Sequence, residues 1–267
     1  RPLSEAEASG DWRAALRAAG GAPAGMEPSP APGAATPEAA EGKRPPPPSP
    51  APPAGDGVDD WVTGLTVGTS GRELAGDPIA TLESIGAVAQ AIAQCRRCPL
   101  YATAKNPVPG EGNPDAGLVC VGEAPGQTED ETGRPFVGAA GQLLTKILAA
   151  INLAREDVFI VNVLKHRPPG NRNPRPEEVE ACSPYLVRQL ELIRPRVIVA
   201  FGTFAAQTLL NTKLPIGQLR GKVHRYYGTP LVATYHPAAL LRNPAWKRPT
   251  WEDVQLARRI LDRSPTA

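Results

Sequence analysis

The chain has 267 residues, enough for one domain of ordinary size or two small ones. Its formal net charge is only +2, so bulk charge indicates no polyanionic partner, and a nucleic-acid role would need local basic clusters. No apolar run approaches the roughly 20 residues that span a bilayer, and the first residues lack the apolar stretch of a signal peptide, so we expect a cytoplasmic protein.

The N-terminal part of the sequence, residues 1–75, is predicted to be a disordered tail before a folded domain at 76–267. A short helix could form at 11–19, but residues 20–57 are Ala, Pro, Gly and Glu with almost no large apolar side chain. Such a segment cannot bury enough surface to offset its ordering entropy. Its Pro-rich run at 45–53 indicates a polyproline-II linker, and a spacer role is favoured over a partner-binding motif.

From about residue 81 the pattern predicts alternating helices and strands. Helices are expected at 81–94, 141–150, 176–193, 203–210 and from 250, and strands at 118–121, 158–164, 196–201, 222–227 and 231–235. Pro184 is expected to kink its helix, and Thr250 to cap the last one. Apolar strands that alternate with helices predict an α/β fold, a three-layer α/β/α sandwich around a mainly parallel sheet.

Polar side chains follow the ends of several predicted strands. Glu123 lies in the turn Gly122-Glu-Ala-Pro-Gly126 after the first strand. Asn162 interrupts the second strand near its end, and His236 follows the last one. Because ligands of parallel sheets bind beyond the carboxyl ends of the strands, we expect the acid, the amide and the imidazole to meet at one edge.

Each of these residues also has an ordinary structural interpretation. The turn around Glu123 matches no dinucleotide or phosphate loop, so a small ligand beside the carboxylate fits better than a plain turn. Asn162 could equally make a structural hydrogen bond or read a nucleobase edge. His236 could be catalytic or solvated. Phe136 would usually pack in a core, but its position between glycines suits a ring exposed for stacking.

Four cysteines in a reducing compartment suggest a metal site or buried thiols before disulfides. Cys95 and Cys98 form a C-x-x-C that follows a helix, unlike a thioredoxin motif. Cys182 could add a ligand, and Cys120 could too, although its mid-strand position favours an inert buried thiol. With His166 the set would be three cysteines and one histidine, which suits zinc or an iron–sulfur cluster, and spacing does not choose between them.

Two loops, residues 167–175 and 239–248, mix Arg or Lys with Asn and apolar side chains. Such loops can hold phosphates and wedge a base stack, although ordinary solvated loops have similar compositions.

Together, these motifs resemble the family-4 uracil-DNA glycosylases, which carry a [4Fe–4S] cluster. The matching pieces are Cys95-x-x-Cys98-Pro-Leu, residues 107–112, 122–126 with Glu129 and Asp130, 133–138, Asn162, 167–172, Ala181-Cys182 and 236–244. They occur in order over roughly residues 91–261.

The sequence departs from this family at two positions. The family usually has Cys where this chain has His166, and it often has Gly where this chain has Ala124. A related subgroup that traps uracil-DNA covalently also has Lys-His at this place, but with a basic insertion that is absent here. We therefore expect turnover and not trapping.

The resemblance implies a base-excision-repair hydrolase that flips uracil out of DNA and cleaves its N-glycosidic bond. The implied roles are a base floor at Gly122 and Ala124, water positioning by Glu123, thymine rejection by Glu129, stacking by Phe136, base reading by Asn162 and leaving-group stabilisation by His236.

The implied DNA contacts are Arg167, Arg172, Leu240, Leu241 and Arg242, and the implied ligands of a structural [4Fe–4S] cluster are Cys95, Cys98, His166 and Cys182. The expected partner is uracil-containing DNA, single- or double-stranded, bound by a monomer at the nucleoid. The alternatives are a uracil-DNA-binding protein without turnover and a redox module that uses the cluster.

Overall fold

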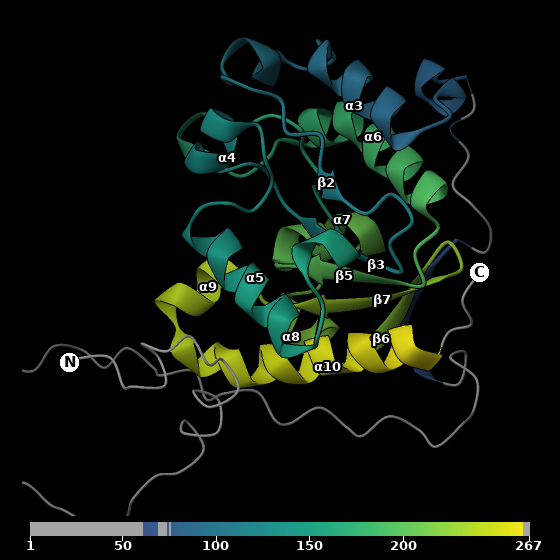
Figure 1. Ribbon diagram of the computed structural model, residues 1–267, viewed down its shortest axis with the longest axis vertical. Helices are drawn as coiled ribbons and strands as arrows, with labels where there is room; N and C mark the ends of the chain where they lie inside the picture. Colours follow the sequence, from purple (N-terminus) through teal and green to yellow (C-terminus); the bar gives the residue numbers. More distant parts are fainter. Residues whose placement is uncertain (1–60, 69–73, 75, 264–267) are drawn as a thin grey trace, which may run out of the picture. The chain divides into compact units, whose positions relative to one another are not determined.

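The computed structural model describes residues 61–68, 74 and 76–263, and these residues contain a seven-stranded sheet (Figure 1). The strands are β1 Val62–Val67, β2 Glu111–Gly112, β3 Leu118–Gly122, β4 Phe159–Asn162, β5 Val197–Phe201, β6 Val223–Tyr226 and β7 Thr229–Thr234. Their order is β1-β6-β7-β5-β3-β4-β2. Only the β2–β4 and β6–β7 pairs are antiparallel, so the predicted mainly parallel sheet is confirmed.

Helices cover both faces of this sheet. The helices are α3 Ile85–Ala93, α4 Gln127–Thr132, α5 Ala139–Ala150, α6 Pro176–Ile193, α7 Thr203–Leu210, α8 Ile216–Leu219, α9 Pro237–Arg242 and α10 Lys247–Arg263. The chain crosses from β3 through α5 to β4, and it then returns past β3 through α6 to β5. Because these two crossovers run in opposite directions along the sheet and such connections are right-handed, α5 and α6 lie on opposite faces. In Figure 1, α6 and α10 lie on opposite sides of the strands, which gives the three predicted layers.

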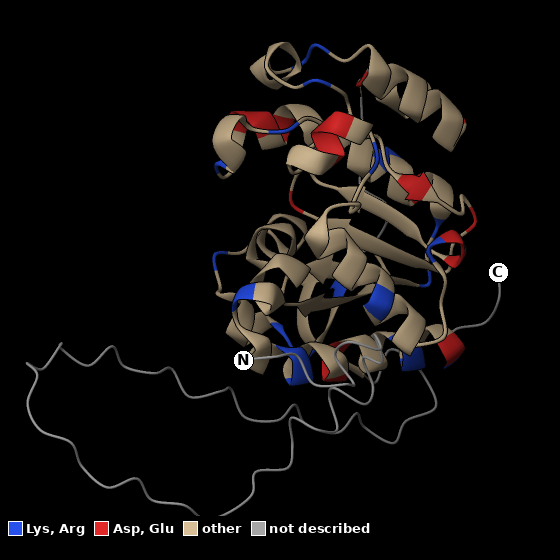
Figure 2. Ribbon diagram, turned by 60° about the vertical axis from the view of Figure 1, so that its left-hand side comes forward, with Lys and Arg blue, Asp and Glu red and all other residues tan. Residues whose placement is uncertain are grey.

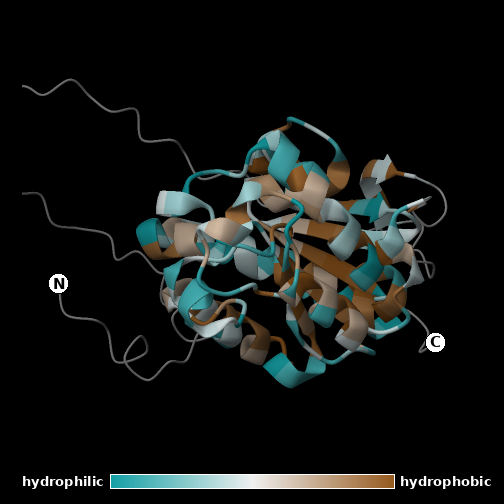
Figure 3. Ribbon diagram, turned by 90° about the horizontal axis from the view of Figure 1, so that it is seen from above, coloured by the Kyte–Doolittle hydropathy of each residue, from teal (hydrophilic) through white to brown (hydrophobic). Residues whose placement is uncertain are grey.

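The central strands are buried on both faces because helices cover both. Every residue of β3 and β5 is buried, and Val119 and Val121 join the core under α6 and α7. Figure 3 shows these strands as the hydrophobic centre of the fold. None of the described helices combines the length and apolarity needed to cross a membrane.

Helix boundaries show where local signals succeeded and where they failed. The predicted limits of α6 and α7 match the structure, and α6 runs through Pro184 as one helix. The cap predicted at Thr250 is wrong, because α10 begins at Lys247 and the Thr250 hydroxyl donates to the Trp246 carbonyl one turn earlier, 2.9 Å away. The helix predicted at 81–94 begins only at Ile85.

Strand β1 corrects the prediction of a disordered segment at residues 1–75. It pairs in parallel with β6, and Trp61 beside it is only 2% exposed. A Cβ on Gly64 would lie 2.3 Å from the His224 ring, so glycine permits the close approach of the strand. The remainder of the predicted tail, residues 1–60, 69–73 and 75, lies outside the described residues.

Candidate active site

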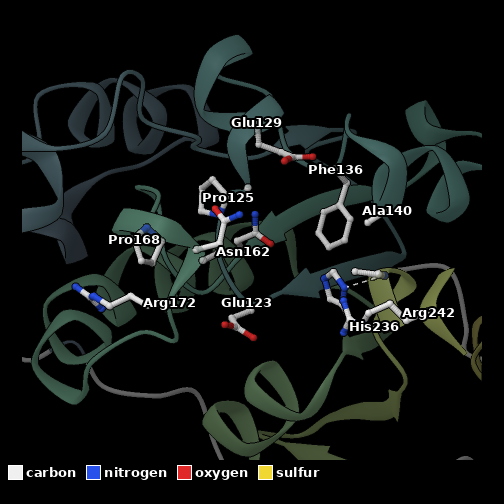
Figure 4. Close-up of a pocket in the computed structure, with 14 residues that line it drawn as sticks. Glu123, Pro125, Glu129, Phe136, Ala140, Asn162, Pro168, Arg172, His236 and Arg242 are labelled. Atoms are coloured by element: carbon white, nitrogen blue, oxygen red, sulfur yellow. Dashed lines mark hydrogen bonds between the residues drawn. The ribbon is translucent and has the colours of Figure 1, made fainter. Parts of the chain in front are cut away.

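A cavity of about 420 Å³ lies at the carboxyl edge of the sheet (Figure 4). Glu123 reaches it from the turn after β3, Asn162 from the end of β4, and His236 from the loop after β7. Gly122 and Asn162 are register partners on neighbouring parallel strands. The predicted meeting of acid, amide and imidazole at one edge is confirmed.

The Asn162 side chain has an unusual hydrogen-bonding status. It is 3% exposed, and its Oδ1 is buried without a hydrogen-bond partner in the described part of the chain. An unsatisfied buried acceptor costs about 1–3 kcal/mol, so such atoms call for a functional explanation. A Cβ on Gly122 would lie 2.3 Å from this oxygen and 2.5 Å from Cζ of Phe136, so only glycine fits beneath both side chains.

Phe136 lines the cavity but is only 5% exposed, which corrects the expectation of an exposed ring. Its ring centroid lies 5.5 Å from that of His236, with 30° between the planes. The residue adopts a φ of 51°, a left-handed conformation that is uncommon for a bulky side chain. The surrounding contacts must therefore hold the ring in place.

His236 is neutral in this environment. Its Nδ1 accepts a hydrogen bond from the Ala238 backbone N–H at 3.2 Å, which places the proton of the neutral ring on Nε2. Burial, with a contribution from the nearby Arg242 charge, lowers the pKa of His236 to about 4. The residue therefore presents a neutral N–H donor at neutral pH.

Two carboxylates line the same cavity with different surroundings. Burial raises the pKa of Glu123, whose backbone carbonyl accepts from the Leu164 N–H at 3.0 Å. Glu129, on α4, accepts from the backbone N–H groups of Val137 at 2.9 Å and Gly138 at 2.8 Å. Glu129 thus faces the cavity and also braces the loop that carries Phe136.

The residues predicted to contact DNA fall into two groups. Leu240 is fully buried, so its predicted DNA contact is wrong, because the turn of α9 directs it into the core. Leu241 is 51% exposed beside the exposed Arg242, as a surface contact requires. Arg172 lines the cavity while donating to the buried Glu178, and Arg167 donates to Asn171 at 2.7 Å. These two arginines therefore also shape their own loop.

Comparisons with known proteins agree with this geometry. The family model described as the uracil DNA glycosylase superfamily matches residues 109–256. The chain belongs to this superfamily.

Type-4 uracil-DNA glycosylases are among the relatives of this superfamily member. The enzyme of Archaeoglobus fulgidus is 54% identical over 171 residues, which cover 61% of this chain and 86% of the relative. That of Pyrobaculum aerophilum is 49% identical over 62% of this chain and 88% of the relative. That of Saccharolobus solfataricus is 44% identical over 69% and 89%.

The cysteines of this superfamily member lie away from the cavity. Cys95, Cys98 and Cys182 pack in one hydrophobic cluster, and burial raises the pKa of Cys182 to about 11. His166 is 6% exposed and shares with Cys95 a second cavity of about 600 Å³. Cys120 is fully buried on β3, as expected for an inert thiol. Among the described residues, no three Cys, His, Asp or Glu side chains are arranged to hold a single metal ion.

Sequence reasoning missed part of the site of this superfamily member. Pro125, Pro168 and Ala140 line the cavity, and the first two lie inside motifs that were recognised for other reasons. Arg155, which bonds the backbone behind Phe136, lies outside every motif. Its position within a short polar turn carried no signal that could have identified it.

Proposed function

We propose that the protein removes uracil from DNA by hydrolysing the bond between N1 of the base and C1′ of the deoxyribose. The observation that carries this proposal is the buried Oδ1 of Asn162, which has no partner among the described residues and lies at a 420 Å³ cavity that Phe136 and His236 also line. A planar base flipped from the stack would fill such a cavity and supply the missing hydrogen bond. The names of the relatives support this substrate.

Asn162 can distinguish uracil from cytosine. Uracil presents an N3–H donor beside its O4 acceptor, which match an amide oxygen and an amide N–H. Cytosine presents an acceptor and a donor at the same places, so both contacts would be repulsive. Glu129, which lines the cavity and is fixed by two backbone N–H groups, would form the wall that excludes the methyl group of thymine.

His236 and Glu123 would divide the chemistry between them. As the bond between N1 and C1′ breaks, its electron pair passes to the base, and the N–H on Nε2 of His236 donates to the uracil O2 where charge accumulates. Preorganised donors of this kind supply the greatest share of the rate enhancement in many enzymes. The Glu123 carboxylate positions a water for attack on C1′ and takes its proton, a role that a raised pKa favours.

Leu241 and Arg242 would contact the DNA around the flipped nucleotide. Both are exposed on α9, the helix that His236 caps. In Figure 2, basic residues also occur along the neighbouring helix α10, where Arg248 has a side chain that is 72% exposed. A leucine that fills the vacated stack and an arginine at the phosphates would stabilise the extruded base.

We propose a [4Fe–4S] cluster as the cofactor, as the resemblance to the family-4 enzymes implies. The candidate ligands suit it: the thiols of Cys95, Cys98 and Cys182 pack together, His166 lies near Cys95, and all four residues offer sulfur or nitrogen donors. These four residues would hold the cluster. When bound, it would supply structural cross-links, because glycosidic hydrolysis transfers no electrons. His166 would then anchor the start of the loop that carries Arg172.

We also propose that the protein acts as a monomer on chromosomal DNA in the cytoplasm. The side chains proposed to read the base and to carry the chemistry, Asn162, Glu123 and His236, meet within one chain, so the proposed reaction needs no residue from a second copy. The catalytic domain would begin at β1, and the segment before it would lie outside the catalytic unit.

A uracil-release assay tests the function. Oligonucleotides with one uracil, single- and double-stranded, are expected to yield free uracil and an alkali-labile abasic site, and matched cytosine and thymine substrates are not. Tight binding to uracil-DNA without release would instead indicate a binding protein that does not turn over.

Iron analysis tests the cofactor. The purified protein is expected to be brown and to contain about four irons per chain. His166→Cys should retain the iron, and His166→Ala should lower it. A colourless protein with one zinc, or full iron in the alanine variant, would contradict the assignment.

A further inference from the structure

The loop that carries Phe136 is held in a conformation that its own sequence does not favour. A bulky side chain at a φ of 51° raises the free energy of the loop relative to ordinary backbone, and the residue here is Phe136 and not the glycine that would avoid this cost. The neighbouring side chains must therefore supply the missing stabilisation.

Arg155 contacts this loop from behind the cavity. Its Nη1 donates to the Phe136 carbonyl and its Nη2 to the Pro135 carbonyl, both at 2.9 Å. Its side chain is 17% exposed and does not line the cavity. Because a guanidinium presents its donors in a rigid planar fork, two bonds to consecutive carbonyls fix the orientations of the two peptide groups that flank Phe136.

Glu111 orients the Arg155 guanidinium. Its Oε1 lies 2.6 Å from Nη2 of Arg155, and its Oε2 lies 2.8 Å from Nε of Arg134. Glu111 lies on the short strand β2, so the ion pair ties the Phe136 loop to the edge of the sheet. Burial raises the pKa of the Glu111 carboxyl, but the two arginines outweigh it together and hold that pKa below its usual range.

The opposite side of the loop is held through its N–H groups. Glu129 accepts from Val137 and Gly138, the two residues that follow Phe136. Gly141 packs directly against the loop. A Cβ there would lie 1.8 Å from the Phe136 carbonyl oxygen, so glycine allows this close approach. The two donors of Arg155 and the shared Oε1 acceptor of Glu129 thus fix successive peptides of one loop.

We infer that Arg155, oriented by Glu111, is a positioning residue that sets the Phe136 ring against the base in the cavity. The inference rests on the proposed function, since it concerns the face on which uracil would stack. Without the two bonds, Phe136 can relax to ordinary backbone, and its ring leaves the position 5.5 Å from His236. Arg155 itself touches no part of the base.

Inhibition by free uracil tests this role directly. It measures how tightly the cavity binds the base, and free uracil has no glycosidic bond to cleave. Arg155→Met is expected to raise the half-inhibitory uracil concentration about tenfold, the effect of losing hydrogen bonds to a charged group. Arg155→Lys, which keeps the charge facing Glu111 but not the fork, should fall between Met and wild type. Binding to uracil-free DNA should stay unchanged in both.

A double-mutant cycle separates this role from general stabilisation. In the Phe136→Ala background, adding Arg155→Met should change uracil inhibition by less than about twofold, because the residue through which Arg155 acts is already gone. Independent, multiplying effects would overturn the inference, as would normal inhibition in Arg155→Met. If Arg155→Met does not fold, Arg155→Lys carries the same cycle.

Arg134→Met is the matched control. Arg134 bonds the same Glu111 carboxylate, but its side chain is 63% exposed and it gives no bond to the Pro135 or Phe136 carbonyls. The half-inhibitory uracil concentration of Arg134→Met should stay at the wild-type value. An increase equal to that of Arg155→Met would contradict the inference. Absence of uracil release by the wild type would refute the proposed function itself, a distinguishable outcome.

Discussion

His236 and His224 differ in how many of their ring nitrogens are hydrogen-bonded. At the β1 edge, both ring nitrogens of His224 are bonded, Nδ1 to the Leu65 N–H at 2.8 Å and Nε2 to the Leu219 carbonyl at 2.7 Å. At the cavity, Nδ1 of His236 accepts from the Ala238 N–H, and within residues 61–68, 74 and 76–263 its Nε2 has no partner. Within the same residues, the buried Oδ1 of Asn162 is also unpaired.

The difference between these regions teaches how to separate structural from functional polar groups in this fold. A buried polar group whose every atom is satisfied stabilises the chain, as His224 does for β1. A buried atom that has no partner among the described residues, as Oδ1 of Asn162 has none, is available to bind a ligand. Changes at the cavity should therefore affect rate, and changes at the β1 edge should affect stability.

The largest expected effect comes from removing the polar side chains that line the cavity. His236→Ala should lower the single-turnover rate of uracil excision about 10²–10³-fold, as for a lost oxyanion donor. Asn162→Ala should cost about 1–3 kcal/mol in the transition state, because an edge of the base loses its partner. Rates measured beside Tm test this contrast. Rate and Tm that fall together would make these residues structural.

Gly122→Ala should also damage the cavity. The new Cβ would overlap Oδ1 of Asn162 and the Phe136 ring, and overpacking costs about 1–3 kcal/mol. Since the two displaced side chains are proposed to contact the base, excision should fall at least about tenfold, which corresponds to about 1.4 kcal/mol. Gly217→Ala, with nothing near its Cβ, is the control and should behave like the wild type.

Gly64→Ala should move stability and leave the rate nearly intact. Its Cβ would overlap the His224 ring and push β1 from β6, with a cost of about 1–3 kcal/mol in the free energy of unfolding. Denaturant titration measures this change. Gly86→Ala in α3, where the nearest atom is 3.8 Å from the new Cβ, is the matched control. The comparison would be contradicted if the excision rate of Gly64→Ala fell by more, converted to free energy, than its free energy of unfolding.

The smallest expected effect is in the pH–rate profile. Because the pKa of His236 is lowered to about 4, its neutral donor persists through the pH range where a free imidazole, with a pKa near 6.5, would titrate. The ratio of the single-turnover rates of wild type and His236→Ala should therefore stay constant through pH 6.5, while both rates fall as Glu123 protonates, at a pH above the ordinary range of that carboxyl. A ratio that halves near pH 6.5 would show that His236 titrates normally.

The pKa of His224 is lowered too, chiefly by burial, and here the consequence concerns stability. The unfolded chain binds a proton at a higher pH than the folded chain, so the contribution of His224 is complete above about pH 6.5 and declines as the pH falls below it. The difference in Tm between wild type and His224→Ala should therefore narrow as the pH falls from 7 to 5. A constant difference would contradict this account.

Local patterns in the sequence determined the α/β class, the parallel central strands and the meeting of Glu123, Asn162 and His236. They could do so because strand periodicity is local and because parallel strands deliver their carboxyl ends to one edge. The bounds of α6 and α7 were predictable for the same reason, since their apolar stripes lie within each helix.

Only the tertiary structure decided which of two adjacent leucines is buried, that β1 joins the sheet, and that Arg155 holds the Phe136 loop. Leu240 and Leu241 are chemically identical, and only the packing of α9 separates their exposures of 0% and 51%. The Leu65 N–H finds its acceptor on His224, 159 residues away, and Arg155 reaches a carbonyl 19 residues back. Such contacts follow from where the folded chain brings distant segments together, and no local pattern records them.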